Sequence, residues 1–394
     1  MQAQRIKSVK SLGKKKCLDF TVDSRDHNFY AEGIVVSNCY AYSYITAYTT
    51  YLKANHTFEY FMSCLKMAQF EDQPLECIDG IQSELPFFNI QLLPPDILKS
   101  TEDYSLEGRN IRMGINAIKG LAGAALPKVK SFKAAVNNKF DLFVNLQSAK
   151  IPVNVAASLI LSGCFDSIRG EVSRNKLLLE FELWKELTDK ELVNCYAFGS
   201  KYNYDLMTIV KEMSSNLHNE KGKPYIKDSR LTTLKKDYDP AKQKYLRNSA
   251  FEELCAYIME TEYLGFSYSY TLKNIYSKWV KDLSTISEVN NTDSNQKVRF
   301  VAIIKELKKK VSKKKVPYIA LELRDERASI KAMIFKEDRI EASKEFNKKD
   351  LEEDDIIIVN GLKKDDVVFI DSVSIQDNPI IIKKSDLKNE KEIK

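Results

Sequence analysis

The spacing of apolar residues changes twice along this chain of 394 residues. In residues 1–38, CLDFTV alternates apolar and polar positions and NFYAEGIVV has two β-rich runs around Glu32-Gly33, which predicts short strands. Between residues 40 and 195, and again over 251–285, apolar residues recur mainly at helical spacing, whereas 196–250 has only weak periodicity. LLPPDI (92–97) interrupts the first of these parts, because each proline disfavours helix in the residue before it. From residue 297 short alternating runs return, and strands are predicted again.

Two helical hairpins are predicted inside the helical part. In the first, IRMGINAIKGLAGAALPKVKSF, a short strand leads into a helical turn over 115–119. A tight turn at 120–123 and a second helix over 124–136 follow. The second hairpin lies in 142–168 and turns at Ser162-Gly163. Glycine at both turns supplies the backbone freedom that a tight reversal needs.

The pattern predicts a multidomain α+β protein with a small β unit, a mainly helical middle and a C-terminal barrel. Five strands with one helix between the third and the fourth is the order of an OB-fold barrel. The predicted segments are 1–38, a β unit; 39–100, helical; 101–195, the hairpin region; 196–250, a polar and poorly structured connector; 251–290, a helical linker; 297–376, the OB barrel; and 377–394, a charged, disordered tail.

Composition narrows the class of protein only a little. Net charge is +6, a mild basic excess that is compatible with nucleic acid without identifying it. Seven Cys at scattered spacings, with no CxxC pair, and only three His argue against a disulfide framework and against a metal cluster. No apolar run approaches the roughly 20 residues of a membrane span, and the first residues lack a signal core. A cytoplasmic protein without a membrane partner is predicted.

Asn38-Cys39, at the boundary between the β unit and the helices, offers specific chemistry. The Asn side-chain nitrogen can attack its own backbone carbonyl, form a succinimide and cut the chain. A Cys thiolate can accept an acyl group and pass it to its own amine. Together the two residues can excise everything upstream. An isolated Asn-Cys pair is ordinarily just a dipeptide, with His27 a buried structural side chain, so the surrounding pattern decides.

That pattern, CLDFTVDSRDHNFYAEGIVVSN followed by Cys, resembles the C-terminal half of a split intein. The resemblance covers residues 1–38. It implies that Cys39 takes over the upstream polypeptide by transesterification and becomes the first residue of the spliced product, while Asn38 cyclises. The N-terminal half of the intein, with its own first nucleophile, would then arrive on another chain.

The same resemblance implies that His27 and Asp26 assist by proton transfer and orientation. Ser37 departs from the His that is usual just before the Asn. A Ser at this place is similar to the split inteins of cyanobacterial replicative polymerases. With Ser37 at this position, His27 would carry out more of the acid–base catalysis, or splicing would be slower.

The sequence after Cys39 resembles the bacterial replicative DNA polymerase III alpha subunit. CYAYSYITAYTTYLKANHTFEYFMSCL is similar to its fingers helix, and LLPPDI, MGINAIKGL, LILSGCFD and ETEYLGFSYS follow in the family's order, over about residues 39–375. The resemblance implies the C-terminal piece of a DNA-directed DNA polymerase, a nucleotidyltransferase of DNA replication. Its expected partners are an N-terminal polymerase fragment carrying the other intein half, primer-template DNA and a sliding clamp.

The catalytic carboxylates of this family belong to the palm, which precedes the fingers. No Asp-x-Asp between predicted strands occurs in this chain, so the chain alone is not expected to polymerise nucleotides. No cofactor is expected in this chain, and Mg²⁺ is expected in the palm of the partner fragment.

The first hairpin fits a helix-hairpin-helix that contacts DNA. Its glycines let the backbone approach a phosphate, amides at the second helix point toward it, and lysines add charge. The residues predicted to contact DNA are Lys119, Gly120, Leu121, Ala122, Gly123, Lys128 and Lys130. The alternative is a helical hairpin whose glycines serve packing. The second hairpin is interpreted as structural.

The barrel carries a second candidate contact with DNA. KELKKKVSKKK (305–315) holds seven Lys in eleven residues and is predicted to be the loop between the first two strands, beside the binding face of OB folds. Phe300 and Tyr318 on the flanking strands are candidates for stacking on bases. The lysines of this candidate site are Lys308, Lys309, Lys310, Lys313, Lys314 and Lys315. A solvated loop is the ordinary alternative.

NYDLM (203–207) is the nearest match to the clamp-binding pattern Gln-x-x-Leu-Phe, through Asn203, Leu206 and Met207, and it departs at the first and last positions. A plain loop is the alternative. The tyrosines that follow Cys39, Tyr48 among them, are predicted to be buried by their helix.

Two other functions remain open for the whole chain. It could be a non-enzymatic accessory protein that binds single-stranded nucleic acid, or a non-covalent polymerase subunit with an inactive intein remnant. An appendage like that of a tRNA synthetase lacks support, because the helical segments match nothing of that kind.

Overall fold

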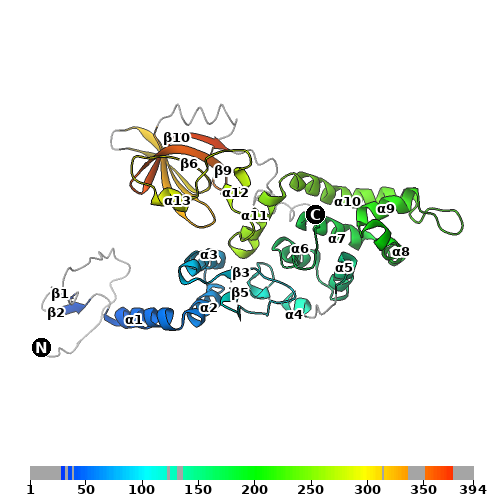
Figure 1. Cartoon of the computed structure of the whole chain (residues 1–394), viewed down its shortest axis with the longest axis horizontal. Coiled ribbons are helices and arrows are strands. Elements are labelled where there is room, and N and C mark those ends of the chain that lie inside the picture. The colour runs from blue at the N-terminus through cyan, green and yellow to red at the C-terminus, as the bar shows by residue number, and fades with distance from the viewer. Residues whose placement is uncertain are drawn as a thin grey trace, which may run out of the picture. The chain divides into compact units, whose positions relative to one another are not determined.

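The computed structural model divides the chain into two units, residues 1–60 and 61–394, which are described separately (Figure 1). The described residues are 28–31, 34–37, 40–121, 125–130, 136–312, 315–335 and 351–375. Outside them lie the predictions for Asp26, His27, Asn38, Cys39, Ala122, Gly123, Lys313, Lys314, the helix between the third and fourth barrel strands, and the tail 377–394.

The first unit begins with a hairpin, as its alternating sequence predicts. Strands β1 (Asn28–Ala31) and β2 (Ile34–Ser37) pair antiparallel, with Asn28 opposite Ser37. Helix α1 (Tyr40–Asn55) follows, and α2 (Thr57–Ala68) begins two residues after α1 ends.

One face of α1 is an exposed apolar stripe. Ile45, Tyr48 and Leu52 recur at helical spacing, Tyr51 flanks them, and Tyr48 keeps 69% of its surface exposed. The prediction that the helix buries Tyr48 is therefore wrong, because no layer covers this stripe among the described residues of the unit. A 16-residue helix is marginal by itself, so the stripe is a surface suited to a further polypeptide.

The second unit starts with short elements around a three-stranded sheet. Strand β3 is parallel to β5, and β4 is antiparallel to β5. The elements are α3 (Pro74–Glu84), η1 (Leu85–Phe88), β3 (Leu92–Leu93), β4 (Ser105–Glu107), β5 (Asn110–Arg112), η2 (Ile115–Ala117) and α4 (Ala125–Lys130).

Helices then continue to residue 249. They are α5 (Lys139–Ser148), α6 (Val153–Leu161), α7 (Arg174–Glu186), α8 (Asp189–Gly199), η3 (Ser200–Tyr202), α9 (Leu206–Ser215) and α10 (Asp228–Ser249). Capping boxes at Asn138 and Thr188 start two of them. The core contains Trp184, which packs against Phe140 and Phe143 at ring distances of 5.0 and 5.5 Å.

The prediction of a poorly structured connector over 196–250 is wrong, because α9 and α10 occupy most of it. The apolar residues of α9 are few but keep helical spacing, and four of the five are buried: Leu206, Ile209, Val210 and Met213. The surrounding Lys and Asn residues mask this short stripe in the sequence.

The predicted helical linker over 251–290 is folded and packed. It holds α11 (Glu252–Leu264), α12 (Leu272–Tyr276) and α13 (Ile286–Asn291). Helix α11 ends at Gly265 with φ 93°, where a Cβ atom would lie 2.5 Å from the carbonyl oxygen of Leu75. This position therefore requires glycine.

The last part is a closed barrel of five strands in the order β10-β8-β7-β6-β9, consistent with an OB fold. Strands β10 and β8 are parallel, and the other pairs are antiparallel. The strands are β6 (Lys297–Val311), β7 (Pro317–Arg324), β8 (Ser329–Ile334), β9 (Ile356–Lys364) and β10 (Val367–Ile375).

Strand β6 is buried on both faces in its first half. Val298, Phe300 and Ala302 point into the barrel core, and Val301 and Ile303 pack against α11 and α12. Phe300 is 0% exposed, so the prediction that it stacks on bases is wrong. Burial on both faces removes the polar alternation that would have shown which side faces outward.

Glu326, near the end of β7, links the stability of this region to pH. Burial, and then the negative charge of Asp325, raise the pKa of Glu326 from 4.5 to about 7. The folded state therefore binds more protons than the unfolded state between these two values, and stability is lost as pH rises through this window.

We expect Glu326→Gln to raise the free energy of unfolding at pH 8 by about 1–3 kcal/mol, and to change it little at pH 4.5. A glutamine oxygen can still accept the hydrogen bond from the Leu272 backbone N–H. Urea unfolding at both pH values measures the difference, with exposed Glu71→Gln as the control. An equal effect of Glu326→Gln at both pH values would contradict the assignment.

Candidate nucleic-acid interface

The first hairpin turns tightly at Gly120. This residue has φ 90°, and the Leu121 backbone N–H donates to the carbonyl oxygen of Ile118. A Cβ atom at Gly120 would lie 3.3 Å from Ser158 Oγ, so the turn packs against α6. The Leu121 side chain is fully buried, so only its backbone could serve a ligand.

Lysines flank this turn on both sides. Lys119 forms an ion pair with Glu262, and its backbone N–H donates to the Tyr263 carbonyl oxygen at 2.9 Å. Half of the Lys119 side chain is exposed. The Glu262 carboxylate offsets part of its positive charge before any ligand binds. Lys128 lies exposed on α4, and the side chain of Lys130 is outside the described residues.

The second hairpin turn is filled by protein. Gly163 has φ 82°, and a Cβ atom there would lie 1.9 Å from Tyr268 Oη and 2.5 Å from an Arg174 nitrogen. A phosphate has no room at that turn, which agrees with its structural interpretation.

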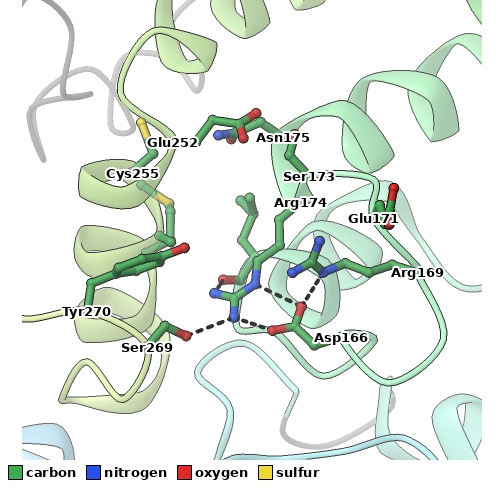
Figure 2. Close-up of a pocket in the computed structure, with 13 residues that line it drawn as sticks. Asp166, Arg169, Glu171, Ser173, Arg174, Asn175, Glu252, Cys255, Ser269 and Tyr270 are labelled. Carbon is green, nitrogen blue, oxygen red and sulfur yellow. Dashed lines mark hydrogen bonds and ion pairs between the residues drawn. The ribbon is translucent and has the colours of Figure 1, made fainter. Parts of the chain in front are cut away.

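Arg174, at the start of α7, is the centre of a buried polar network (Figure 2). Its guanidinium donates to Asp166 at 2.5 and 3.0 Å, to Glu260 at 2.7 Å and to Tyr268 Oη at 2.8 Å. Arg174 is 8% exposed and Glu260 is 0% exposed. A buried charge of this kind is tolerable only when it is fully paired, as it is here.

Asp166 lies on the side of the network that faces solvent. Burial raises the pKa of Asp166, but hydrogen bonds and positive charge from Arg174 and Arg169 outweigh it and leave that pKa below 3.8. The network lines a cavity of about 180 Å³ together with Ser173, Asn175 and other residues of α7 and α11. Each guanidinium here already pairs with a carboxylate, so the cavity is poorly suited to binding an anion. It is a gap between packed helices.

Arg174 and Glu260 were not among the residues predicted from the sequence. A signal exists for Glu260, since it falls on the same helical face as buried Tyr257 and Leu264. A carboxylate at an apolar-face position indicates a buried ion pair, but its partner cannot be found from spacing alone.

The barrel bears a stack of three aromatic rings, here called the aromatic ladder. Tyr318 from β7 stacks on Phe335 with ring centroids 5.0 Å apart and planes 16° apart. Phe335, which follows β8, stacks in turn on Phe369 of β10 at 5.7 Å and 13°. Lys364 Nζ lies 5.2 Å from the Phe369 ring. Phe335 is 36% exposed.

Lysines share the outer face with the ladder. Lys310 lies opposite Tyr318 and Lys308 opposite Ala320, and directly opposed residues of an antiparallel pair project from the same face. Lys308 to Lys310 thus belong to β6, so their predicted place in a loop is wrong. Lys309 lies opposite buried Ile319 and projects from the other face, and Lys315 is exposed in the turn that follows.

Of the three rings, Tyr318 was predicted from the sequence, and Phe335 and Phe369 were not. Both occupy outward positions, between or beside buried residues such as Ile334, Val368 and Ile370, and that alternation was the available signal. A row of aromatic rings bordered by lysines can stack on nucleobases and attract the backbone of a single strand.

The predicted clamp peptide is part of a helix start. Asp205 caps α9, Asn203 has φ 50°, and Leu206 is fully buried. The backbone N–H of Leu206 donates to Glu180. Leu206 is therefore not available to a partner in this fold, and only Asn203 and part of Met207 reach the surface.

Within the described residues no helix is long and apolar enough to cross a membrane. In the same part of the chain, no three His, Cys, Asp or Glu side chains gather closely enough to hold a metal ion.

Solved structures with a resembling barrel include a domain of replication protein A from Methanococcus maripaludis. It is 21% identical, has a TM-score of 0.19, and the match covers 24% of this chain and 93% of that domain. Aspartyl tRNA synthetase from Entamoeba histolytica is 18% identical with a TM-score of 0.19, covering 24% of this chain and 21% of that protein. At these scores the likenesses carry no argument, and the OB assignment rests on strand order and register.

Proteins of similar sequence match most of the chain. Residues 89–177 match the helix-hairpin-helix motif family. DNA polymerase III subunit alpha of Aquifex aeolicus (strain VF5) is 26% identical over 340 residues, which is 84% of this chain and 24% of that protein. The same subunit of Buchnera aphidicola subsp. Acyrthosiphon pisum (strain APS) is 23% identical over 335 residues, 82% of this chain and 26% of that protein. The chain spans about a quarter of the length of these relatives and is homologous to the C-terminal part of the DNA polymerase III alpha subunit.

Proposed function

We propose that this chain is the DNA-binding C-terminal part of a replicative DNA polymerase, and that it acts in DNA-templated synthesis together with a polypeptide that supplies the palm. The observation that carries the proposal is the match over 84% of the chain to a polymerase III alpha subunit. Mg²⁺ would be held in the palm, where it would assist nucleotidyl transfer. A sliding clamp is a further expected partner.

Two surfaces of this chain would contact DNA. The turn at Gly120, with the amides that follow it and Lys119 and Lys128, would contact phosphates without reading sequence. The aromatic ladder, with Lys308, Lys310 and Lys364, would hold single-stranded template. Binding at both surfaces should weaken with salt, because lysine–phosphate contacts release counterions.

The test of the whole proposal is reconstitution. The chain is mixed with the polypeptide homologous to the remaining part of the subunit, and extension of a primed template is measured with Mg²⁺ present. We expect extension only when both polypeptides are present. If they neither associate nor extend the primer, while this chain alone binds single strands, the accessory-protein alternative would be favoured instead.

Phe335→Ala tests the aromatic ladder. Loss of one stacking ring should weaken binding of a thymidine oligonucleotide by about tenfold, because base–aromatic stacking contributes about 1–3 kcal/mol per base. Fluorescence anisotropy at fixed salt measures the affinity. The matched control is Phe87→Ala, since Phe87 is 84% exposed and lies in η1, outside the barrel. If the two variants lose the same affinity, the aromatic ladder is not part of the binding site.

We also propose that residues 1–38 are the C-terminal half of a split intein, which joins the two polymerase pieces at Asn38-Cys39. Support comes from the sequence pattern of residues 1–38 and from the antiparallel hairpin of β1 and β2, in which Asn28 pairs with Ser37. The alternative is an inactive remnant and a non-covalent enzyme of two chains. Intact mass measurement of the mixture distinguishes a fused product from two unchanged chains.

A further inference from the structure

Helix α11 contacts the first hairpin near its C-terminal end. The Lys119 backbone N–H donates to the carbonyl oxygen of Tyr263, and the Lys119 ammonium pairs with Glu262. The residue that precedes Gly120 is therefore held by both its backbone and its side chain. This fixes the turn that the proposed function assigns to duplex phosphates.

The same helix holds the second hairpin through Glu260. Its carboxylate is fully buried and accepts five hydrogen bonds. The donors are Arg174 at 2.7 Å, Ser267 Oγ at 2.9 Å, the Tyr268 backbone N–H at 2.9 Å, and the Ser269 backbone N–H and Oγ at 3.0 and 2.5 Å. Because Arg174 also binds Asp166, one carboxylate joins α11, the loop after it and the hairpin region.

The first half of α11 contacts the barrel. Leu254 and Tyr257 belong to one buried apolar cluster with residues of α12 and with the outer face of β6 and β9. The barrel residues in this cluster are Val301, Ile303, Ile356 and Ile358. The barrel is thus attached by a buried apolar surface and not by a flexible tether.

The distances between these anchors are short. Leu254 and Tyr263 are nine residues apart on α11, which is about 14 Å at 1.5 Å per residue. Two DNA-binding elements attached to one helix can engage adjacent stretches of one molecule at high effective concentration.

We propose that α11 fixes the hairpin and the barrel so that they bind a duplex–single-strand junction as one ligand, with Glu260 and Arg174 as positioning residues. The inference rests on the proposed function, since it assumes that both surfaces bind DNA. It adds that the junction itself, and not either arm, is the preferred ligand of this chain, and that this preference depends on a buried network that touches no DNA.

The experiment uses the full chain and three probes. These are a duplex of about 20 base pairs with a 5′ thymidine extension of about 12 nucleotides, within the range that one OB fold occupies, the same duplex with blunt ends, and the extension alone. We expect the junction to bind about 10–100-fold more tightly than the better of the two arms. Glu260→Gln should reduce this advantage about tenfold or more, with each separate arm bound within about twofold of the native affinity.

Ser269→Ala serves as the milder variant if Glu260→Gln does not fold, because it removes one donor and leaves all charges in place. Lys176→Met is the control, since it breaks an ion pair with Asp205 that does not involve α11. The inference is overturned if the native chain binds both arms but has no preference for the junction, or if folded Ser269→Ala keeps the full preference. If the native chain binds neither arm, the proposed function itself fails.

Discussion

Asn38→Ala should abolish release of the upstream segment and formation of a fused polymerase. In the native chain, the Asn38 side-chain nitrogen would attack its own carbonyl carbon and break the bond to Cys39. The 38-residue peptide would leave with a C-terminal succinimide, and the freed Cys39 amine would take the acyl group from its own sulfur. Alanine has no such nitrogen, so the yield of fused product should fall to background. Intact mass spectrometry of the mixed fragments measures it.

Two further variants sharpen this test. Cys39→Ala should also prevent fusion, because no sulfur accepts the incoming polypeptide, while cleavage after Asn38 can still occur. Asn55→Ala, at the end of α1, replaces an Asn outside the intein segment and should splice like the native chain. Fused product from Asn38→Ala would exclude the proposed step, and absence of fusion with the native chain would leave residues 1–38 as a remnant.

Arg174→Met should lower the free energy of unfolding by about 3–5 kcal/mol. The substitution leaves the buried Glu260 carboxylate without its cation, and breaking a buried ion pair from one side is costly for that reason. In a thermal unfolding experiment the midpoint should fall by roughly 6–20 °C, at about 2–4 °C per kcal/mol for a domain of this size.

Arg169→Met is the matched control, because Arg169 also pairs with Asp166 but its side chain is 24% exposed. Its effect should be about 0–1 kcal/mol. The pH dependence gives a second check. Since Arg174 holds the pKa of Asp166 below its ordinary 3.8, that stabilisation is present above pH 3.8 and is lost as pH falls further. The difference between native chain and Arg174→Met should shrink there, and a constant difference would contradict this account.

Local patterns predicted the hairpins and the barrel correctly because both depend on short-range signals. Gly120 and Gly163 mark turns through a backbone conformation that other residues avoid, and the structure has both at positive φ. The barrel follows from five short strand-like runs whose order leaves few topologies open. The homologous relatives agree with the resemblance to a polymerase that the order of the motifs after Cys39 indicated.

Contacts between residues far apart in the chain could not be predicted from the sequence. Glu260 and Arg174 are 86 residues apart, and nothing in their neighbourhoods indicates that they meet. Phe300 and Phe335 illustrate the same limit at the barrel. Both follow strand-like spacing, but only the closed barrel decides that the first is buried and the second joins the ladder. The helix α9 was missed for the opposite reason, since its local signal was present but surrounded by polar residues.

The packing of α11 and α12 against β6 has a consequence for folding during synthesis. Ile303 of β6 pairs with Ile356 of β9, about 50 residues later, so β6 leaves the ribosome roughly 3–10 s before its partner at about 5–20 residues per second. An unpaired strand with Val301 and Ile303 on its outer face is prone to aggregation in that interval. Helices α11 and α12 have already emerged by then, and in the complete fold they pack against these two side chains. We therefore expect the two helices to cover the outer face of β6 before β9 is synthesised.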